Sequence, residues 1–266
     1  MAVTVPDLTR SSALDLFRGF GIALRGLGLV FSTPALSRLA LGVAFVTVVT
    51  LVGLVAGLWF AVPALVGWAW TPPDTWWGAS LFTVAEILVF LLFLVAGANT
   101  LPMMLAAPLM DPISIATERL LGVEVRSEEG VKRMVTEVVH AVANGLVRLV
   151  VLALGQLLLL LVLLIPGLGG PLWSVLSWTW TALWLSAAHL DVPMARHLYP
   201  FDQELSVLRR RPLLCVGFGA AVALMLWVPV LNCFFVPAAV ISSTLLFRGL
   251  VAAGLLPAPK ESGAPG

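Results

Sequence analysis

Four long stretches with no Asp, Glu, Lys or Arg dominate the pattern of apolar and polar positions along the chain. They cover residues 39–73, 87–110, 149–190 and 212–247. A helix that crosses a bilayer needs about 20 mostly apolar residues, and each stretch is longer than that. The pattern therefore predicts an all-α, polytopic integral membrane protein.

Two of the predicted helices are long enough to cross the membrane completely. They cover residues 39–62 and 79–101. We expect the first to end at Pro63 and the second at Pro102, because proline removes a backbone donor and clashes inside a helix. Tryptophan favours the boundary between membrane and water, so the cluster beyond the first span marks the far interface; it consists of Trp59, Trp68, Trp70, Trp76 and Trp77.

The other two stretches are interrupted by proline and glycine and predict helical hairpins. The first break covers residues 166–171 and the second covers residues 229–237. Arms of about 17 residues in the first hairpin reach about 25 Å, and the last arm, 238–247, reaches about 15 Å. A hydrocarbon core is about 30 Å thick, so hairpins that enter and return on one side fit better than full crossings. Snorkelling of Arg248 could still extend the last arm to Leu256.

The charged residues predict the orientation. All 15 Lys and Arg residues fall in segments on one side of the predicted spans, between residues 10–38, 119–148, 196–211 and 248–260. Basic residues accumulate in cytoplasmic segments. We therefore expect both termini in the cytoplasm.

An amphipathic helix is predicted before the first span. Ser12 and Asp15 are spaced as in a capping box, and the helix places Asp15, Arg18 and Arg25 on a polar face. This pattern is typical of a helix that lies on the inner leaflet. We expect a cytoplasmic tail and interfacial helix over 1–33, a membrane domain over 34–256 and a disordered tail over 257–266. The apolar face consists of Leu14, Phe17, Gly21, Leu24, Gly28 and Phe31.

A polar stripe marks the helix that leads into the first hairpin. We expect this helix to open at residues 127–129. Polar positions recur on it at every fourth residue, which puts them on one face. The simpler interpretation is a face in contact with water and headgroups, and the alternative is one wall of an aqueous path. The stripe consists of Lys132, Thr136, His140, Asn144 and Arg148.

Composition excludes several classes of protein. Of the 266 residues, 60% are hydrophobic and 11% are charged, whereas ordinary domains carry about 45–50% apolar and about 25% charged residues. A water-soluble enzyme is excluded, and a net charge of +1 gives no basis for nucleic-acid binding. Cys215 and Cys233 lie in apolar runs and are interpreted as small buried hydrophobes. We find no catalytic constellation, no metal-ligand spacing and no cofactor motif.

Several strings carry a resemblance to a known family. Residues 190–197 read LDVPMARH, 228–232 read VPVLN and 236–240 read VPAAV. Gly19-Phe20, Gly26, Pro34, Arg38, the 107–112 string APLMDP, Phe201, the arginines at 209–211 and Phe218-Gly219 stand in the expected order. From residue 14 to residue 250 the chain resembles the CysZ sulfate permease family, which shares its domain with the etoposide-induced membrane proteins.

The resemblance implies a function and an assembly. It implies two long transmembrane helices and two partly penetrating hairpins, assembled as a homo-oligomer in the bacterial inner membrane. It also implies proton-linked or passive uptake of sulfate or sulfite for cysteine synthesis.

The resemblance also implies a binding site. The family's anion site resembles a Pro-Gly-Leu-Arg-Arg stretch at a helix start, and the matching residues here, 34–38, read PALSR. We therefore expect Leu36, Ser37 and Arg38 to bind the oxyanion, with Arg25 assisting. Free N–H groups at a helix start attract an anion, and Arg38 adds charge. Ser37 can donate a hydrogen bond but supplies no charge.

A second function stays open from the sequence. The amphipathic helix and the basic segments could hold anionic lipid or a protein partner, which would make the protein a non-transporting membrane scaffold. Dependence on sulfate distinguishes the two functions, because we expect it of an oxyanion transporter and not of a membrane scaffold.

Overall fold

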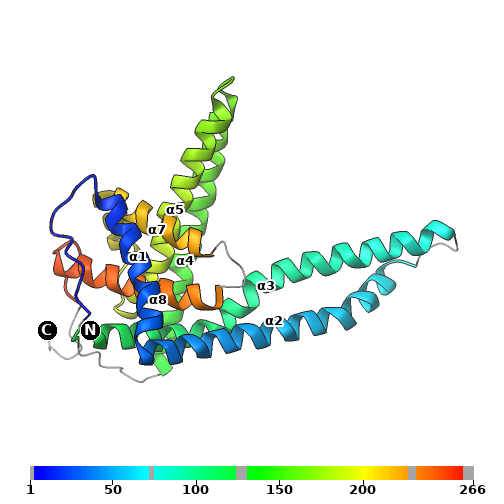
Figure 1. The fold of residues 1–266 in the computed structure, drawn as a ribbon. Helices are drawn as coiled ribbons and strands as arrows, with labels where there is room; N and C mark the ends of the chain where they lie inside the picture. Colours follow the sequence, from blue (N-terminus) through cyan, green and yellow to red (C-terminus); the bar gives the residue numbers. More distant parts are fainter. Residues whose placement is uncertain (1–2, 72–74, 124–130, 227–231, 260–266) are drawn as a thin grey trace. The chain divides into compact units, whose positions relative to one another are not determined.

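The computed structural model describes residues 3–71, 75–123, 131–226 and 232–259. Within these ranges the structure describes the backbone but not the side chains of residues 76, 99, 100, 102–104, 107, 108, 131–143, 232 and 233. Every regular element in these ranges is a helix (Figure 1). In chain order they are α1 (Asp15–Ser32), α2 (Pro34–Ala69), α3 (Trp76–Leu120), α4 (Val131–Leu159), the 3₁₀ helix η1 (Leu160–Leu164), α5 (Gly169–Arg196), α6 (Phe201–Arg210), α7 (Pro212–Leu226) and α8 (Asn232–Ala252).

The chain divides into two compact units. Unit 1 comprises Met1–Ala40 and Met110–Gly266, and unit 2 comprises Leu41–Leu109. Among the described residues, four helices are long and apolar enough to cross a membrane, which confirms a polytopic membrane protein. The four segments are Pro34–Ala69, Trp77–Ala98, Asn144–Leu164 and Phe234–Ala252.

Unit 2 consists of the apolar parts of α2 and α3. Leu54 packs against Gly97, and the rings of Trp70 and Phe82 lie 6.1 Å apart. The predicted ends of the spans were wrong: α2 continues past Pro63 to Ala69, and α3 continues past residue 102 to Leu120. Lipid cannot hydrogen-bond a broken backbone, so a membrane helix tolerates a proline more readily than it ends there.

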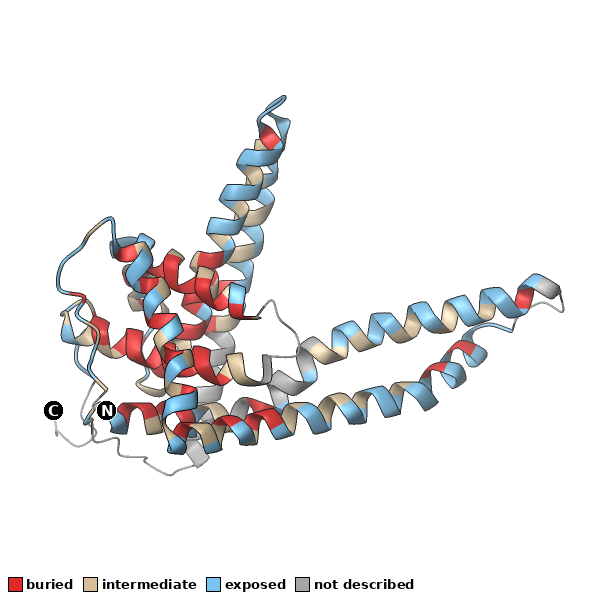
Figure 2. Ribbon diagram, in the orientation of Figure 1, coloured by how far each residue is buried: buried red, intermediate tan, exposed pale blue. Residues whose placement is uncertain are grey.

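The core of unit 1 is built around α7 and α8, which contact α1 and α5. Buried residues concentrate in these helices (Figure 2). Pro237 lies inside α8, so the predicted ten-residue arm was wrong, while residues 229–231 of the predicted break lie outside the described part. Protein rather than lipid surrounds most of α8. Its fully buried large side chains, with those of α7, are Leu214, Phe218, Ile241, Leu245, Leu246, Phe247 and Leu250.

Glycines let these helices approach backbone to backbone. A Cβ added at Gly19 of α1 would lie 2.1 Å from the Leu214 carbonyl oxygen of α7, and one at Gly217 of α7 would lie 1.9 Å from the Leu16 carbonyl oxygen. Both distances are far below van der Waals contact. No larger residue fits there unless the two helices separate.

The outer face of α1 stays uncovered within unit 1. Gly19, Ile22, Gly26 and Val30 face the core, whereas the large side chains of the predicted apolar face are exposed, Phe17 to 70%. Asp15, assigned to the polar face by the sequence, is buried at 2% exposure. Helix α1 therefore has two apolar faces. The large exposed side chains are Leu14, Phe17, Leu24 and Phe31.

The first hairpin turns where the sequence predicted, but its second arm is longer than the predicted 17 residues: α5 begins at Gly169, inside the predicted break, and has 28 residues. Helix α4 and η1 run up one arm, the chain turns at Gly167 with φ of 76°, and α5 returns from Gly169. Figure 2 shows that the end near the turn is mostly exposed. Polar contacts join the arms: Gln156 donates from Nε2 to Thr181 Oγ1 at 2.8 Å and accepts from Ser177 Oγ at 2.8 Å.

Only part of the predicted polar stripe can be placed. Residues 127–129 and the side chains of Lys132, Thr136 and His140 lie outside the described part. Asn144 and Arg148 are buried, at 8% and 9% exposure. Contact with water was therefore the wrong interpretation for these two, because Arg148 has buried partners that the sequence could not identify.

Candidate functional site

Three of the four predicted oxyanion residues, Leu36, Ser37 and Arg38, lie at the start of α2, directly after α1. Ser37 connects the two helices, because its hydroxyl donates to the carbonyl oxygens of Val30 at 2.5 Å and Thr33 at 3.1 Å. The side chain of Leu36 is fully buried. Pro34 stands at the first position of α2, where its missing N–H costs nothing and its fixed φ suits a helix.

The two arginines of the predicted site differ in their surroundings. Arg38 is exposed on the first turn of α2. Arg25 on α1 donates from Nη2 to Thr4 Oγ1 at 3.0 Å. Among the described residues no contact joins Arg25 to Arg38. The first amides of any α-helix have no partner four residues back. The N–H groups of Ala35 and Leu36 therefore point out of the N-terminal end of α2.

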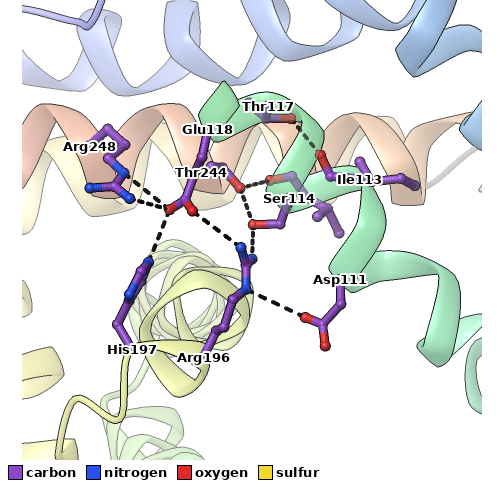
Figure 3. Close-up of polar contacts among 10 residues, drawn as sticks. Asp111, Ile113, Ser114, Thr117, Glu118, Arg196, His197, Thr244 and Arg248 are labelled. Atoms are coloured by element: carbon purple, nitrogen blue, oxygen red, sulfur yellow. Dashed lines mark hydrogen bonds and ion pairs between the residues drawn. The ribbon is translucent and has the colours of Figure 1, made fainter. Parts of the chain in front are cut away.

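A second polar cluster, which we call the Glu118 cluster, lies inside unit 1 and was missed from the sequence. Glu118 of α3 is fully buried. Its carboxylate accepts from Arg196 Nη1 at 3.2 Å, Arg248 Nε at 3.0 Å and His197 Nε2 at 3.1 Å. Figure 3 shows these three side chains converging on the carboxylate from α5, its C-terminal end and α8. One acid therefore holds two guanidiniums and an imidazole.

Neighbouring side chains complete the Glu118 cluster. Ser114 Oγ and Thr244 Oγ1 lie 2.9 Å apart, and Arg196 also donates to Ser114 Oγ. Asp111 Oδ1 lies 3.8 Å from Arg196 Nε and is 59% exposed, so the cluster extends from the interior toward the surface (Figure 3).

The surroundings of Glu118 keep it ionised. Burial opposes the charged form, but the hydrogen bond from His197 and the charges of Arg196 and Arg248 outweigh it. Together they hold the pKa of the Glu118 carboxyl below its ordinary value of 4.5.

A third polar group, centred on Arg148, has the opposite balance of charge. Arg148 of α4 makes a two-pronged contact with Glu204 of α6, at 3.1 and 2.9 Å, and its Nη2 lies 3.3 Å from Asp191 of α5. Two carboxylates thus share one guanidinium. Burial, with the nearby charge of Asp191, raises the pKa of Glu204 to about 7 against the opposing effect of Arg148.

The Glu118 cluster and the Arg148 group are suited to binding charged groups rather than to covalent catalysis. Among the described side chains, no three His, Cys, Asp or Glu residues gather where they could hold a metal ion. Cys215 is buried, as expected, and Cys233 lies outside the described side chains. The sequence held one signal for the Glu118 cluster: Asp111, Ser114 and Glu118 recur at spacings of three and four, on one face of a helix.

Comparison with known proteins identifies the family of the chain. Residues 22–237 match the family model described as "Sulfate transporter CysZ/Etoposide-induced protein 2.4". The chain is 30% identical over 149 residues to the sulfate transporter CysZ of Vibrio cholerae, covering 56% of this chain and 60% of that protein. The alignment thus spans less than two thirds of that relative.

Two other relatives align over more of their length. The sulfate transporter CysZ of Vibrio parahaemolyticus is 25% identical over 86% of this chain and 93% of its own. That of Salmonella typhimurium is 28% identical over 67% of this chain and 74% of its own. Because the family model covers most of the 266 residues, the chain belongs to the family of the sulfate transporter CysZ and the etoposide-induced protein 2.4.

Proposed function

We propose that this protein takes up a small oxyanion, sulfate or sulfite, across the bacterial inner membrane. The single observation that carries the proposal is the family match over residues 22–237, in a family of transporters rather than enzymes. The relatives named as sulfate transporters support the choice of substrate. Four apolar helices of spanning length agree with a role in permeation.

The oxyanion binds at the start of α2 in this proposal. The exposed guanidinium of Arg38 supplies the charge, and the amides of Ala35 and Leu36, which have no partner four residues back within α2, supply hydrogen bonds, as at other helix starts that hold anions. Ser37 acts through its position, since its hydroxyl fastens the start of α2 to Val30 and Thr33. Arg25 adds positive charge from α1.

Both termini face the cytoplasm in this proposal. The support is the restriction of all 15 basic residues to one side of the spans. The exposed apolar side chains of α1 would then lie in the inner leaflet, where an apolar helix face that protein leaves uncovered is stable. We also propose a homo-oligomer, on the strength of the family resemblance.

The direct test is sulfate uptake into proteoliposomes that contain the purified protein. Arg38→Ala should reduce affinity for sulfate about tenfold or more, because a hydrogen bond to a charged group contributes about 1.5–3 kcal/mol. Arg209→Ala, which removes an exposed arginine elsewhere, is the matched control and should transport normally.

Two outcomes would argue against the proposal. If Arg38→Ala transports with unchanged affinity, the site is not at the start of α2. If the well-inserted wild-type protein takes up no sulfate, the membrane-scaffold alternative gains, because the exposed apolar face of α1 would then be its main functional surface.

A further inference from the structure

We propose that Arg196, Arg248 and His197 form a second oxyanion site, which the Glu118 carboxylate occupies as a built-in competitor. This second site shares no residue with the uptake site proposed at the start of α2. An external oxyanion would bind there only when the carboxylate leaves.

The geometry is that of an anion-binding site. Arg248 contacts Glu118 Oε1 through Nε at 3.0 Å and through Nη2 at 2.9 Å. His197 Nε2 contacts the same oxygen at 3.1 Å. Arg196 Nη1 contacts the other carboxylate oxygen, Glu118 Oε2, at 3.2 Å. Guanidinium groups favour carboxylates, sulfate and phosphate because their planar N–H donors match the spacing of the oxygens. The donors come from α5, its C-terminal end and α8, whereas the acid comes from α3 (Figure 3).

The charge balance explains why an anion is required at this position. Arg196 and Arg248 are each about 10% exposed, and Glu118 is the fully buried acid between them. Removing its charge would take away the one carboxylate that both guanidiniums contact. Buried charges that lose their partner are costly, so an external anion would be drawn to fill the position.

The Arg148 group provides an internal contrast. There two acids, Glu204 and Asp191, face one guanidinium. Loss of Glu204 would leave Arg148 paired with Asp191, and no external anion is needed. Replacing the acid by alanine should therefore create a need for an external anion at Glu118 but not at Glu204.

The experiment compares Glu118→Ala, Glu118→Gln and Glu204→Ala, each combined with Arg38→Ala to remove the site at the start of α2. Sodium sulfate and sodium formate are titrated into the detergent-purified proteins against chloride at equal ionic strength. The readouts are the thermal unfolding midpoint and the dissociation constant from calorimetry. A ligand that binds only the folded state raises the midpoint.

We expect the Glu118→Ala protein to bind sulfate roughly tenfold more tightly than Arg38→Ala alone, and to be stabilised by formate as well. Glu118→Gln should show no such gain, because the amide has the shape of the acid and fills its position. Glu204→Ala should show none either.

Several results would overturn the inference. These are no anion-dependent gain in Glu118→Ala, an equal gain in Glu204→Ala, or a Glu118→Ala protein that stays misfolded in sulfate and formate alike. A Glu118→Ala protein that is monodisperse in sulfate but not in chloride would support it. Since every protein compared lacks Arg38, these outcomes do not depend on whether the proposed uptake site is correct.

Discussion

Arg211 donates a hydrogen bond from Nη1 to Asp15 Oδ2 at 2.8 Å, and both side chains are almost completely buried. The same guanidinium donates from Nη2 to the carbonyl oxygen of Leu8 at 2.6 Å. The pair joins the first turn of α1 to the residue that separates α6 from α7. It therefore fixes the N-terminal segment and α1 onto the core of unit 1.

Asp15→Ala should destabilise the protein strongly. It leaves the buried Arg211 guanidinium without its acid, and breaking such a pair costs about 3–5 kcal/mol. The measurement is the unfolding free energy in detergent. Arg18→Ala removes the exposed partner of Asp15 and should cost about 0–1 kcal/mol. Equal effects of the two substitutions would show that the Arg211 pair contributes little.

Gly19→Ala should force α1 away from α7. The added methyl group would lie 2.1 Å from the backbone of Leu214, which cannot move alone. Overpacking of this kind costs about 1–3 kcal/mol. Gly21→Ala on the same helix meets nothing within 4 Å and should be neutral or stabilising by up to about 1 kcal/mol. Thermal unfolding of both variants tests this, and a Gly19→Ala protein as stable as wild type would contradict it.

Glu204 should make stability depend on pH near neutrality. Its pKa is raised to about 7 in the folded protein from 4.5, so between these values the folded state binds more protons than the unfolded state. The contribution of Glu204 therefore increases as the pH falls from about 7 to about 4.5, and is absent above that window. Glu204→Gln should remove this dependence, as measured by unfolding midpoints between pH 8 and pH 5.5. An unchanged profile in the variant would assign the dependence to another group.

Glu118 should show the opposite dependence. Because its pKa is lowered below 4.5, its stabilising contribution is complete above that value and is lost as the pH falls through the folded-state pKa. Glu118→Gln should therefore be less stable than wild type at pH 7, and the difference should shrink on acidification. A difference that stays constant down to pH 3 would contradict this prediction.

The turn of the α4–α5 hairpin should remain out of reach of water on the far side. The segment Asn144–Leu164 is long enough to cross as a whole. The uncharged part of this arm, however, covers only the 17 positions that follow Arg148, up to Ile165, or about 25 Å of helix, which is less than a hydrocarbon core of about 30 Å. In a chain without its native cysteines, Leu168→Cys should react slowly with an impermeant maleimide added outside. Thr75→Cys, beyond α2, should react quickly. Comparable rates at the two positions would show that the hairpin crosses completely.

The hairpin and the start of α2 could be predicted because their signals are local. Pro166 and Gly167 act on their own backbone, and Pro34 presets the first turn of α2. The same rule failed at Pro63 and Pro237, which lie inside α2 and α8. A proline shows where one hydrogen bond is lost, but whether the helix ends depends on what surrounds it.

The charged clusters could not be predicted. Glu118 lies 78 positions from Arg196 and 130 from Arg248, and Arg148 lies 56 positions from Glu204. Spacing places Asp111, Ser114 and Glu118 on one helical face. It does not tell which cations that face will meet, because that depends on how α3, α5 and α8 pack.

The sequence by itself determined that the protein is helical and embedded in lipid. Lipid offers no hydrogen bonds, so an uncharged apolar stretch must satisfy its backbone within its own helix, and this requirement is readable one segment at a time. Only the tertiary structure decided which apolar faces are covered by protein. Helix α8 reads as a span and yet is mostly buried, and Asp15 reads as a surface acid and yet is paired inside. Burial and ion pairing depend on how several helices pack together, and the sequence of a single helix does not specify either of these properties.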